Sequence, residues 1–213
     1  MPILGSDKWL ERVFSAPSNV ALAAAYDEWA PTYDADMLSI GYVNPAVVAG
    51  LVGRYIRDRA GQIFDAGVGT GILGDVLSIL GYRDLSGVDI SDGMLAKARA
   101  RKVYGDLRNR VLGEALDFEN GSVVAVVSTG VFTIGHAPPS AFDELVRMTR
   151  PGGHLIFTVG TPAWQDGGFK EKIQSLEEAG RIQAVEATNA YRPMPVSPTE
   201  AALTTRAFVY RVS

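Results

Sequence analysis

Apolar residues near the start of the chain recur three and four positions apart, which is the spacing of one helix face. Within residues 8–30, Trp9, Leu10, Val13 and Phe14 follow this spacing, and an alanine-rich stretch comes after them. The pattern therefore predicts N-terminal helices that lie outside the main sheet.

From about residue 46 onward, helical patterns alternate with short β-branched runs. The predicted helices are Ala46–Asp58, Ile72–Leu80, Asp92–Lys102, Ala141–Met148 and Phe169–Ala179. The predicted strands are Gln62–Asp65, Asp84–Val88, Val111–Leu112, Val123–Val127, His154–Val159, Ile182–Glu186 and Arg206–Val212. Most connections between these strands are long enough to hold a helix, so the rhythm predicts a parallel sheet covered on both faces.

Capping and turn residues separate these elements. Ser91 is a predicted N-cap because its hydroxyl can accept a bond from a first-turn amide, and Pro151–Gly153 is a predicted turn that leads into a strand. Tyr191–Pro198 has the composition of an extended, proline-rich connection. Because no helix separates the last two strands, we expect an antiparallel hairpin at one edge of the sheet. We predict an N-terminal helical segment over residues 1–45 and one α/β domain over residues 46–213.

Composition narrows the class of protein. The chain has 213 residues, of which 47% are hydrophobic and 21% charged, and this is enough apolar material for one sizeable core. It has no cysteine, which excludes thiol nucleophiles, cysteine metal sites and disulfides and favours the cytoplasm. The net charge is −4, and we see neither a signal peptide nor an apolar run of membrane-spanning length. We therefore expect a small-molecule partner, no nucleic acid, no membrane insertion and no metal site.

A glycine-rich segment closes a predicted strand and opens a helix. In Asp65–Gly71 three glycines alternate with other residues, which permits positive φ and lets a ligand approach the backbone. Gly69–Gly74 also fits the dinucleotide fingerprint, whereas the register that starts at Gly67 places Asp65 at the strand end. A carboxylate at that place repels a phosphate and attracts an ammonium or sulfonium group. It therefore favours a cationic cofactor.

A second acid, Asp89, ends the next predicted strand about 20 residues after the glycine loop and is followed by Ile90. A carboxylate in this position can accept hydrogen bonds from both ribose hydroxyls of an adenosine. The alternative is a helix-capping acid. Together, the glycine loop and the segment at Asp89 and Ile90 indicate an adenosine-type cofactor.

In four segments, which occur in order, the chain resembles the class I S-adenosylmethionine-dependent methyltransferases. Asp65–Gly71 is similar to their glycine loop, Asp89 to their ribose acid, Gly113–Ala115 to their adenine-contacting segment, and Arg150–Gly153 to the turn before their fifth strand. The resemblance implies a doubly wound, Rossmann-like α/β fold with seven mostly parallel strands in the order 3-2-1-4-5-7-6 and an antiparallel edge hairpin. It also implies S-adenosyl-L-methionine as the cofactor. The loop and adenine contacts that it implies are Asp65, Gly67, Gly69, Thr70, Gly71, Glu114 and Ala115.

A narrower resemblance involves Tyr26–Asp34, Gly135–Pro138, Phe169–Glu171 and Glu177–Gly180. These segments are similar to the methyltransferase-like family of the Williams–Beuren deletion region and its bacterial relatives. We do not transfer a substrate from that family to this chain.

Tyr26, Trp29 and Tyr33 share one helix face, three and then four residues apart. This spacing predicts a hydrophobic dock for the N-terminal helix. The resemblance implies a lid, in which Tyr33 closes over the cofactor and Trp29, together with Tyr26, bounds the acceptor pocket. Both roles are compatible. Met94, on the helix after Asp89, is a candidate to pack on the adenine, with core filling as the alternative.

The predicted fold brings further polar residues to the same edge of the sheet. Ser128, Thr129 and Gly130 follow the buried central strand, where ligands bind in such folds, and the resemblance implies that they pass the methionine part of the cofactor. His136 lies in a loop over the same end and is the candidate general base. The alternative is a loop histidine that is bonded to the backbone.

Three functions are compatible with these features. The first is an S-adenosylmethionine-dependent methyltransferase that acts on an oxygen or nitrogen of a small molecule by in-line displacement. A sulfonium methyl is already activated, so such an enzyme mainly aligns the acceptor and excludes water. The second is a nonenzymatic binder of S-adenosylmethionine or S-adenosylhomocysteine. The third, a nicotinamide-dependent oxidoreductase, depends on the Gly69–Gly74 match alone.

Overall fold

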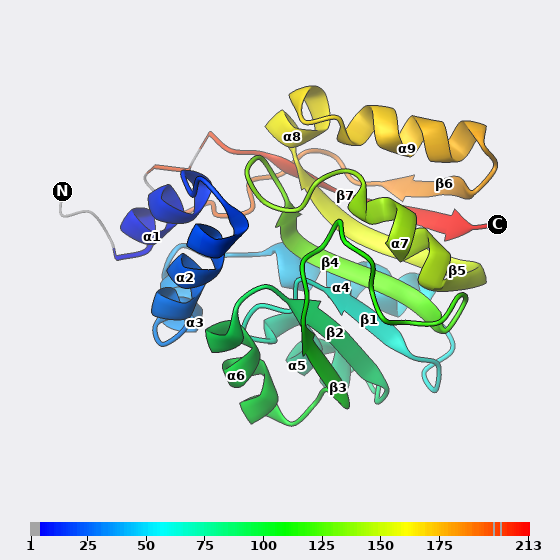
Figure 1. Ribbon diagram of the computed structural model, residues 1–213, viewed down its shortest axis with the longest axis horizontal. Helices are drawn as coiled ribbons and strands as arrows, with labels where there is room; N and C mark the ends of the chain where they lie inside the picture. The colour runs from blue at the N-terminus through cyan, green and yellow to red at the C-terminus, as the bar shows by residue number, and fades with distance from the viewer. Residues whose placement is uncertain (1–4, 198, 201) are drawn as a thin grey trace.

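A computed structural model of the protein describes residues 5–197, 199–200 and 202–213. In these residues seven strands form one sheet of order β3-β2-β1-β4-β5-β7-β6 (Figure 1). The strands are β1 (Ile63–Ala66), β2 (Leu85–Asp89), β3 (Asp106–Asn109), β4 (Val123–Phe132), β5 (Thr149–Gly160), β6 (Ile182–Ala187) and β7 (Thr205–Val212). Strands β3, β2, β1, β4 and β5 pair in parallel, and β7 runs antiparallel to both β5 and β6. The predicted fold, strand order and edge hairpin are confirmed.

Helices cover both faces of the sheet, with α7 and α9 in front of it and α4 behind it in Figure 1. The helices are α1 (Gly5–Phe14), α2 (Asn19–Trp29), α3 (Tyr33–Ser39), α4 (Asn44–Tyr55), α5 (Ile72–Ile79), α6 (Asp92–Arg101), α7 (Ala141–Met148), α8 (Thr161–Asp166) and α9 (Phe169–Glu178). The predicted cap of α6 is present, because the Ser91 hydroxyl accepts from the Met94 amide at 3.0 Å.

Two predicted elements are wrong. Val111–Leu112 is not a strand, because β3 lies earlier at Asp106–Asn109, where a polar edge sequence lacks the apolar run used to recognise strands. Pro151–Gly153 is not a free turn but part of β5, where the register shifts against β4 and makes a bulge. Of the Tyr191–Pro198 connection, Tyr191 bridges Thr205, and Pro198 lies outside the described residues.

The N-terminal helices α1, α2 and α3 lie together beside the sheet (Figure 1). Their apolar core contains Trp29 and Met37 and also includes Met194 from the connection to β7. The N-terminal segment therefore packs with a distant part of the chain. The division into residues 1–45 and 46–213 remains a proposal.

Aromatic side chains fill the core between the sheet and helices α7 and α9. Phe142 is fully buried there, with its ring centroid 4.7 Å from that of Phe132 and 4.7 Å from that of Phe157. Such tilted and edge-to-face contacts are favourable for aromatic rings beyond the area that they bury. This cluster fixes α7 against β4 and β5.

We expect Phe142→Ala to lower the free energy of unfolding by about 3–5 kcal/mol, because the lost ring leaves a cavity in a closely packed core. Urea titration followed by circular dichroism measures this as a lower midpoint with an unchanged slope. Ile79→Ala, at a side chain that is 84% exposed, is the control and should change the stability little. Equal effects of the two substitutions would contradict the assignment of the core.

Candidate functional site

A glycine loop connects the end of β1 to the start of α5. Gly67, Gly69 and Gly71 all have positive φ, of 86°, 55° and 86°, which side chains rarely tolerate. A Cβ atom on Gly67 would lie 2.2 Å from a methyl group of Val131, whereas one on Gly69 would enter open space. The loop therefore presents bare backbone to an open volume beside it.

Most of the amide groups of this loop are already used within the protein. The Gly67 and Val68 amides both donate to the Val88 carbonyl at 3.0 Å, and the Gly71 amide donates to the Val68 carbonyl at 3.0 Å. The Gly69 amide donates to the Asp89 carboxylate at 2.7 Å. A loop that binds a pyrophosphate must instead direct free amides at the ligand. These contacts disfavour the dinucleotide interpretation of the loop.

Asp89, at the end of β2, is held by backbone on both carboxylate oxygens. Besides the bond from Gly69 to one oxygen, the Ser91 amide donates to the other at 2.9 Å. Burial raises the pKa of Asp89 to about 6, and the bonds from Ser91 and Gly69 limit the rise. The carboxylate is thus fixed at the sheet edge, with lone pairs left over for a ligand.

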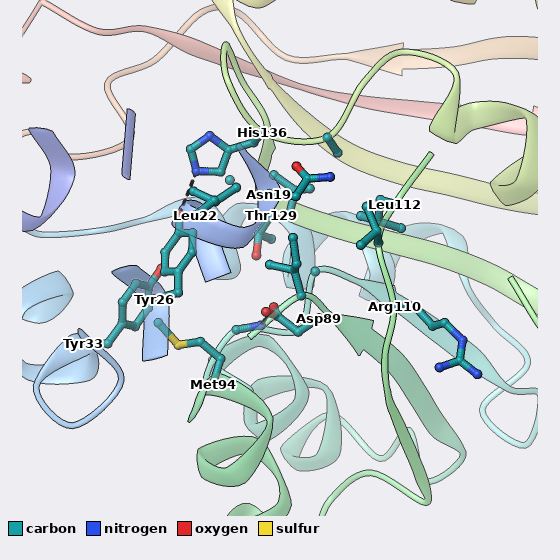
Figure 2. A pocket seen from close by; sticks show the side chains of 17 residues that line it. Asn19, Leu22, Tyr26, Tyr33, Asp89, Met94, Arg110, Leu112, Thr129 and His136 are labelled. Carbon is teal, nitrogen blue, oxygen red and sulfur yellow. Dashed lines mark hydrogen bonds between the residues drawn. The ribbon is translucent and has the colours of Figure 1, made fainter. Parts of the chain in front are cut away.

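A cleft of about 710 Å³, including its open mouth, lies over this loop and under α2 (Figure 2). The residues predicted from the sequence that line it are Tyr26, Tyr33, Gly67, Gly69, Asp89, Ile90, Met94, Thr129, Gly130 and His136. The lining residues that were not predicted are Asn19, Leu22, Arg110, Val111, Leu112, Val131 and Ala137. The predicted residues thus come from four separate parts of the chain and meet at one place.

Other predicted residues lie behind the cleft wall. Asp65 is buried in β1, where one carboxylate oxygen accepts from the Tyr104 hydroxyl at 2.6 Å and the other has no partner among the described residues. Burial raises the pKa of Asp65 to about 7, and the bond from Tyr104 opposes the rise. Ser128 donates to the Ala66 carbonyl at 2.7 Å and so links β4 to β1. Asp65 and Ser128 therefore pack behind the glycine loop, on the side away from the cleft.

Glu114 and Ala115 are exposed and do not line the cleft. The wall at this point is made by Arg110, Val111 and Leu112, which follow β3 directly. The third strand was predicted at Val111–Leu112, after the true end of β3 at Asn109, so the cofactor contacts were predicted too late in the chain. A strand predicted to end at Asn109 would have identified Arg110, Val111 and Leu112 as the lining residues.

Two aspartates on the N-terminal helices bind the loops of the cleft. Asp27 of α2 accepts from the Ser91 hydroxyl at 2.6 Å and from the Gly93 amide at 2.8 Å. Asp34 of α3 accepts from the Thr70 hydroxyl and pairs with Arg101. The predicted residue Thr70 thus contacts α3 rather than the open volume, and both helices are held over the cleft.

His136 and Tyr26 form a pair at one end of the cleft (Figure 2). The Tyr26 hydroxyl lies 2.9 Å from His136 Nε2, and His136 Nδ1 lies 3.4 Å from the Ile134 carbonyl oxygen. A carbonyl can only accept, so Nδ1 carries the proton and Nε2 accepts from the tyrosine. Burial lowers the pKa of His136 and raises that of Tyr26, so both side chains are neutral near pH 7.

A second cavity, of about 560 Å³ with its mouth, adjoins the first under α1, α2 and α3. Tyr26, Tyr33 and Gly130 line both cavities. Trp29, predicted to bound an acceptor pocket, lines the second cavity only. The two volumes therefore meet beside the tyrosine that contacts His136.

Within the part of the chain that the structure describes, no group of three His, Asp or Glu side chains could hold a metal ion. No single helix in that part is long and apolar enough to cross a membrane. Helices α3 and α4 pass such a test only as a pair, and they are bent by 90°.

Comparisons with known proteins find relatives of this chain. A family model described as a methyltransferase domain matches residues 64–157, which include the glycine loop and Asp89. Methyltransferase-like protein 27 of Homo sapiens is 32% identical over 169 residues, which are 76% of this chain and 68% of that protein. Demethylmenaquinone methyltransferase of Renibacterium salmoninarum is 32% identical over 142 residues, 63% of this chain and 56% of that protein.

The matched proteins differ in the acceptors that their names state. An 18S rRNA (guanine(1575)-N(7))-methyltransferase of Saccharomyces cerevisiae is 38% identical over 89 residues, 41% of this chain and 32% of that protein. Among solved structures, that of the [4+2]-cyclase SpnF superposes with a TM-score of 0.69 at 13% identity, over 92% of this chain and 97% of that one. The likeness to that structure concerns the fold alone.

We expect Asp89→Ala to weaken the binding of S-adenosylhomocysteine by about 10- to 100-fold, because a carboxylate that accepts ligand hydroxyls contributes about 1.5–3 kcal/mol. Calorimetric titration measures this, with reduced nicotinamide adenine dinucleotide as the competing ligand. Asp84→Ala, an exposed acid that precedes the same strand, is the control. Binding of the nicotinamide dinucleotide alone would contradict the interpretation of the loop.

Proposed function

Because the chain belongs to the class I S-adenosylmethionine-dependent methyltransferases, we propose that it transfers the methyl group to an oxygen or nitrogen of a small-molecule acceptor by in-line displacement. When bound, S-adenosyl-L-methionine supplies a methyl carbon activated by a sulfonium centre. The protein then has to hold the acceptor in line with that carbon and exclude water.

The residues of the first cleft fit this cofactor. Asp89 offers carboxylate oxygens to the ribose hydroxyls, and the space next to Gly69 lets adenosine lie against the backbone. Asp65 places a second acid behind the loop. Asp65 is buried and Asp89 is half-buried, and two acids near the cleft favour a cationic ligand over a phosphate. Arg110 does not offset them, because it pairs with Asp117 and Figure 2 shows its guanidinium directed away from Tyr26 and His136.

The position of the second cavity directly beside the first is the observation that carries the proposal of a small acceptor. The second cavity lies under the N-terminal helices and meets the cofactor cleft at Tyr26, Tyr33 and Gly130. Asp27 and Asp34 hold these helices over the cleft. A small molecule fits into such a volume, whereas a nucleic acid or folded protein would have to displace the helices.

We propose that His136 acts as the general base through Tyr26. As the acceptor attacks, its proton passes to the Tyr26 oxygen, and the tyrosine proton passes to His136 Nε2, 2.9 Å away. The new bond to the methyl carbon forms while the carbon–sulfur bond breaks. The lowered pKa of His136 supports this role, because the imidazole is neutral before the reaction and releases the proton to solvent afterwards.

The direct test is the formation of S-adenosylhomocysteine from S-adenosylmethionine in the presence of a panel of small alcohols, phenols, amines and nitrogen heterocycles. We expect turnover that depends on the acceptor, with the methyl group found on oxygen or nitrogen by mass spectrometry. Cofactor binding without turnover on any acceptor would favour the nonenzymatic alternative. Efficient methylation of RNA or protein would contradict the proposed substrate class.

We expect His136→Gln to reduce kcat by about 10²–10⁴-fold while the affinity for S-adenosylhomocysteine stays unchanged, because the base is lost and the cofactor contacts remain. In the unaltered protein at saturating cofactor, kcat should fall only at a pH clearly below the ordinary histidine pKa of about 6.5, because burial lowers the pKa of His136 and protonation then removes the base. This acid limb should disappear in the variant.

His154→Gln is the matched control, because His154 is the other histidine of the chain and lies on β5 outside both cavities. Unchanged kcat in the His136 variant would show that alignment alone suffices for the reaction.

A further inference from the structure

The described side chains that line the second cavity are uncharged. Among the described residues that border it there is no Asp, Glu, Lys, Arg or His, although charged residues make up 21% of the chain. Its walls are aromatic and aliphatic side chains of α1, α2 and α3, with Met194 and Leu203 from the connection to β7. A surface of this kind binds ligands by apolar contact and a few neutral hydrogen bonds.

A charged acceptor would find no partner in this cavity. Moving an ion from water into an apolar site costs several kcal/mol unless an opposite charge compensates it. The phenols in the wall do not supply one, since burial raises the pKa of Tyr42 to about 12 and raises that of Tyr33 well above its ordinary value. The wall of the cavity therefore discriminates against both anions and cations.

Aromatic rings form one side of the cavity. The Trp29 ring meets the Tyr33 ring edge-to-face with centroids 4.7 Å apart, and it stacks on Tyr26 at 6.0 Å. Trp29 is 1% exposed, and its Nε1 donates to Asp36 at 2.8 Å, which fixes the indole. Rigid rings favour flat ligands that stack on them or meet them edge-on.

The polar groups of the cavity are neutral and are held in place. Asn44 is 3% exposed, and its side-chain oxygen accepts from the Tyr191 hydroxyl at 2.9 Å. Its amide nitrogen lies 3.5 Å from the Tyr42 hydroxyl. Thr158 accepts from the Gly130 amide at 2.9 Å and retains its own hydroxyl proton for another acceptor. Such groups recognise a hydroxyl, a carbonyl or a neutral nitrogen.

These polar groups lie next to the cofactor cleft. A Cβ atom on Gly130, which lines both cavities, would be 2.4 Å from the Tyr42 hydroxyl. The Tyr42 phenol therefore reaches the backbone that separates the two volumes. An acceptor in the apolar part of the second cavity would direct its polar atom to this point.

We propose that the second cavity is the acceptor site and that it selects an uncharged, mainly apolar ring compound whose hydroxyl or neutral nitrogen faces the cofactor cleft. This inference rests on the proposed function and narrows its substrate class. Contact with the Tyr33 ring, which the buried Trp29 ring holds in place, positions the ligand ring, and the group at Asn44, Tyr42 and Thr158 orients the atom that is methylated.

The test uses three ring compounds of similar size that differ in charge: 4-methylphenol, benzoate and benzylammonium. Each is titrated into the full-length protein with saturating S-adenosylhomocysteine, and binding is followed by nuclear magnetic resonance or calorimetry. We expect 4-methylphenol to bind at least tenfold more tightly than either ion. Equal binding of an ion, or no binding of 4-methylphenol, would overturn the inference.

A cavity-filling variant locates the binding. Thr133 lines the second cavity but not the first, so Thr133→Phe should weaken the binding of 4-methylphenol at least tenfold and leave that of S-adenosylhomocysteine unchanged. Leu38→Phe is the control, because Leu38 is 81% exposed on α3 beside the cavity-lining Met37. Equal binding of 4-methylphenol to both variants would contradict the assignment.

Measuring S-adenosylhomocysteine first separates the two proposals. A protein that binds it but does not distinguish the three probes would contradict the acceptor class and leave the methyltransferase function standing. A protein that binds 4-methylphenol in a Thr133-dependent manner without binding S-adenosylhomocysteine would support the cavity assignment and contradict the proposed function.

Discussion

The bond between the Asp89 carboxylate and the Gly69 amide is the interaction on which the site depends. It joins the end of β2 to the glycine loop after β1, at 2.7 Å, and the Ser91 amide completes the arrangement at 2.9 Å. The bond consumes an amide that a phosphate would otherwise require, and it fixes a carboxylate where a ribose can reach it. One half-buried carboxylate therefore holds the loop in place, and the proposed ribose contact depends on the same group.

The N-terminal helices depend on the same two loops. Asp27 binds the segment after Asp89 through Ser91 and Gly93, while Asp34 binds the glycine loop through Thr70. The helices that complete the second cavity are thus attached to the loops that form the first. Displacing either helix to admit a ligand breaks charge-assisted hydrogen bonds, which are stronger than neutral ones. A movement of either helix would therefore change both cavities.

The fold was predictable because its signals are local and strong. Apolar β-branched runs predict the strands, and apolar residues three and four positions apart predict the helices. The strand order was predicted from the resemblance to the class I methyltransferases. The position of β3 was not predictable, since Asp106–Asn109 is a polar edge strand. Because the strand was expected too late in the chain, the cleft contacts were expected at Glu114, whereas Arg110–Leu112 make them. The second cavity was only partly predictable, because Tyr42 and Asn44 meet Gly130 only through tertiary contacts. Periodicity carries no information about such contacts.

The first cavity is lined by charged side chains and the second, in the described part of the chain, is not, and this difference suits a reaction between a cationic cofactor and a neutral acceptor. In the proposed reaction a sulfonium centre would enter a cleft that Asp89 lines and that Asp65 supports from behind, while a neutral acceptor would enter a cavity with no charged side chain among the described residues that line it. The reaction converts the cation to a neutral thioether and releases one proton from the acceptor. In the proposed mechanism the neutral His136 of the first cleft takes that proton through Tyr26, which lines both cavities, so the second cavity does not have to hold a charge. A charged acceptor would break this balance, because its partner charge would have to come from a wall that has none.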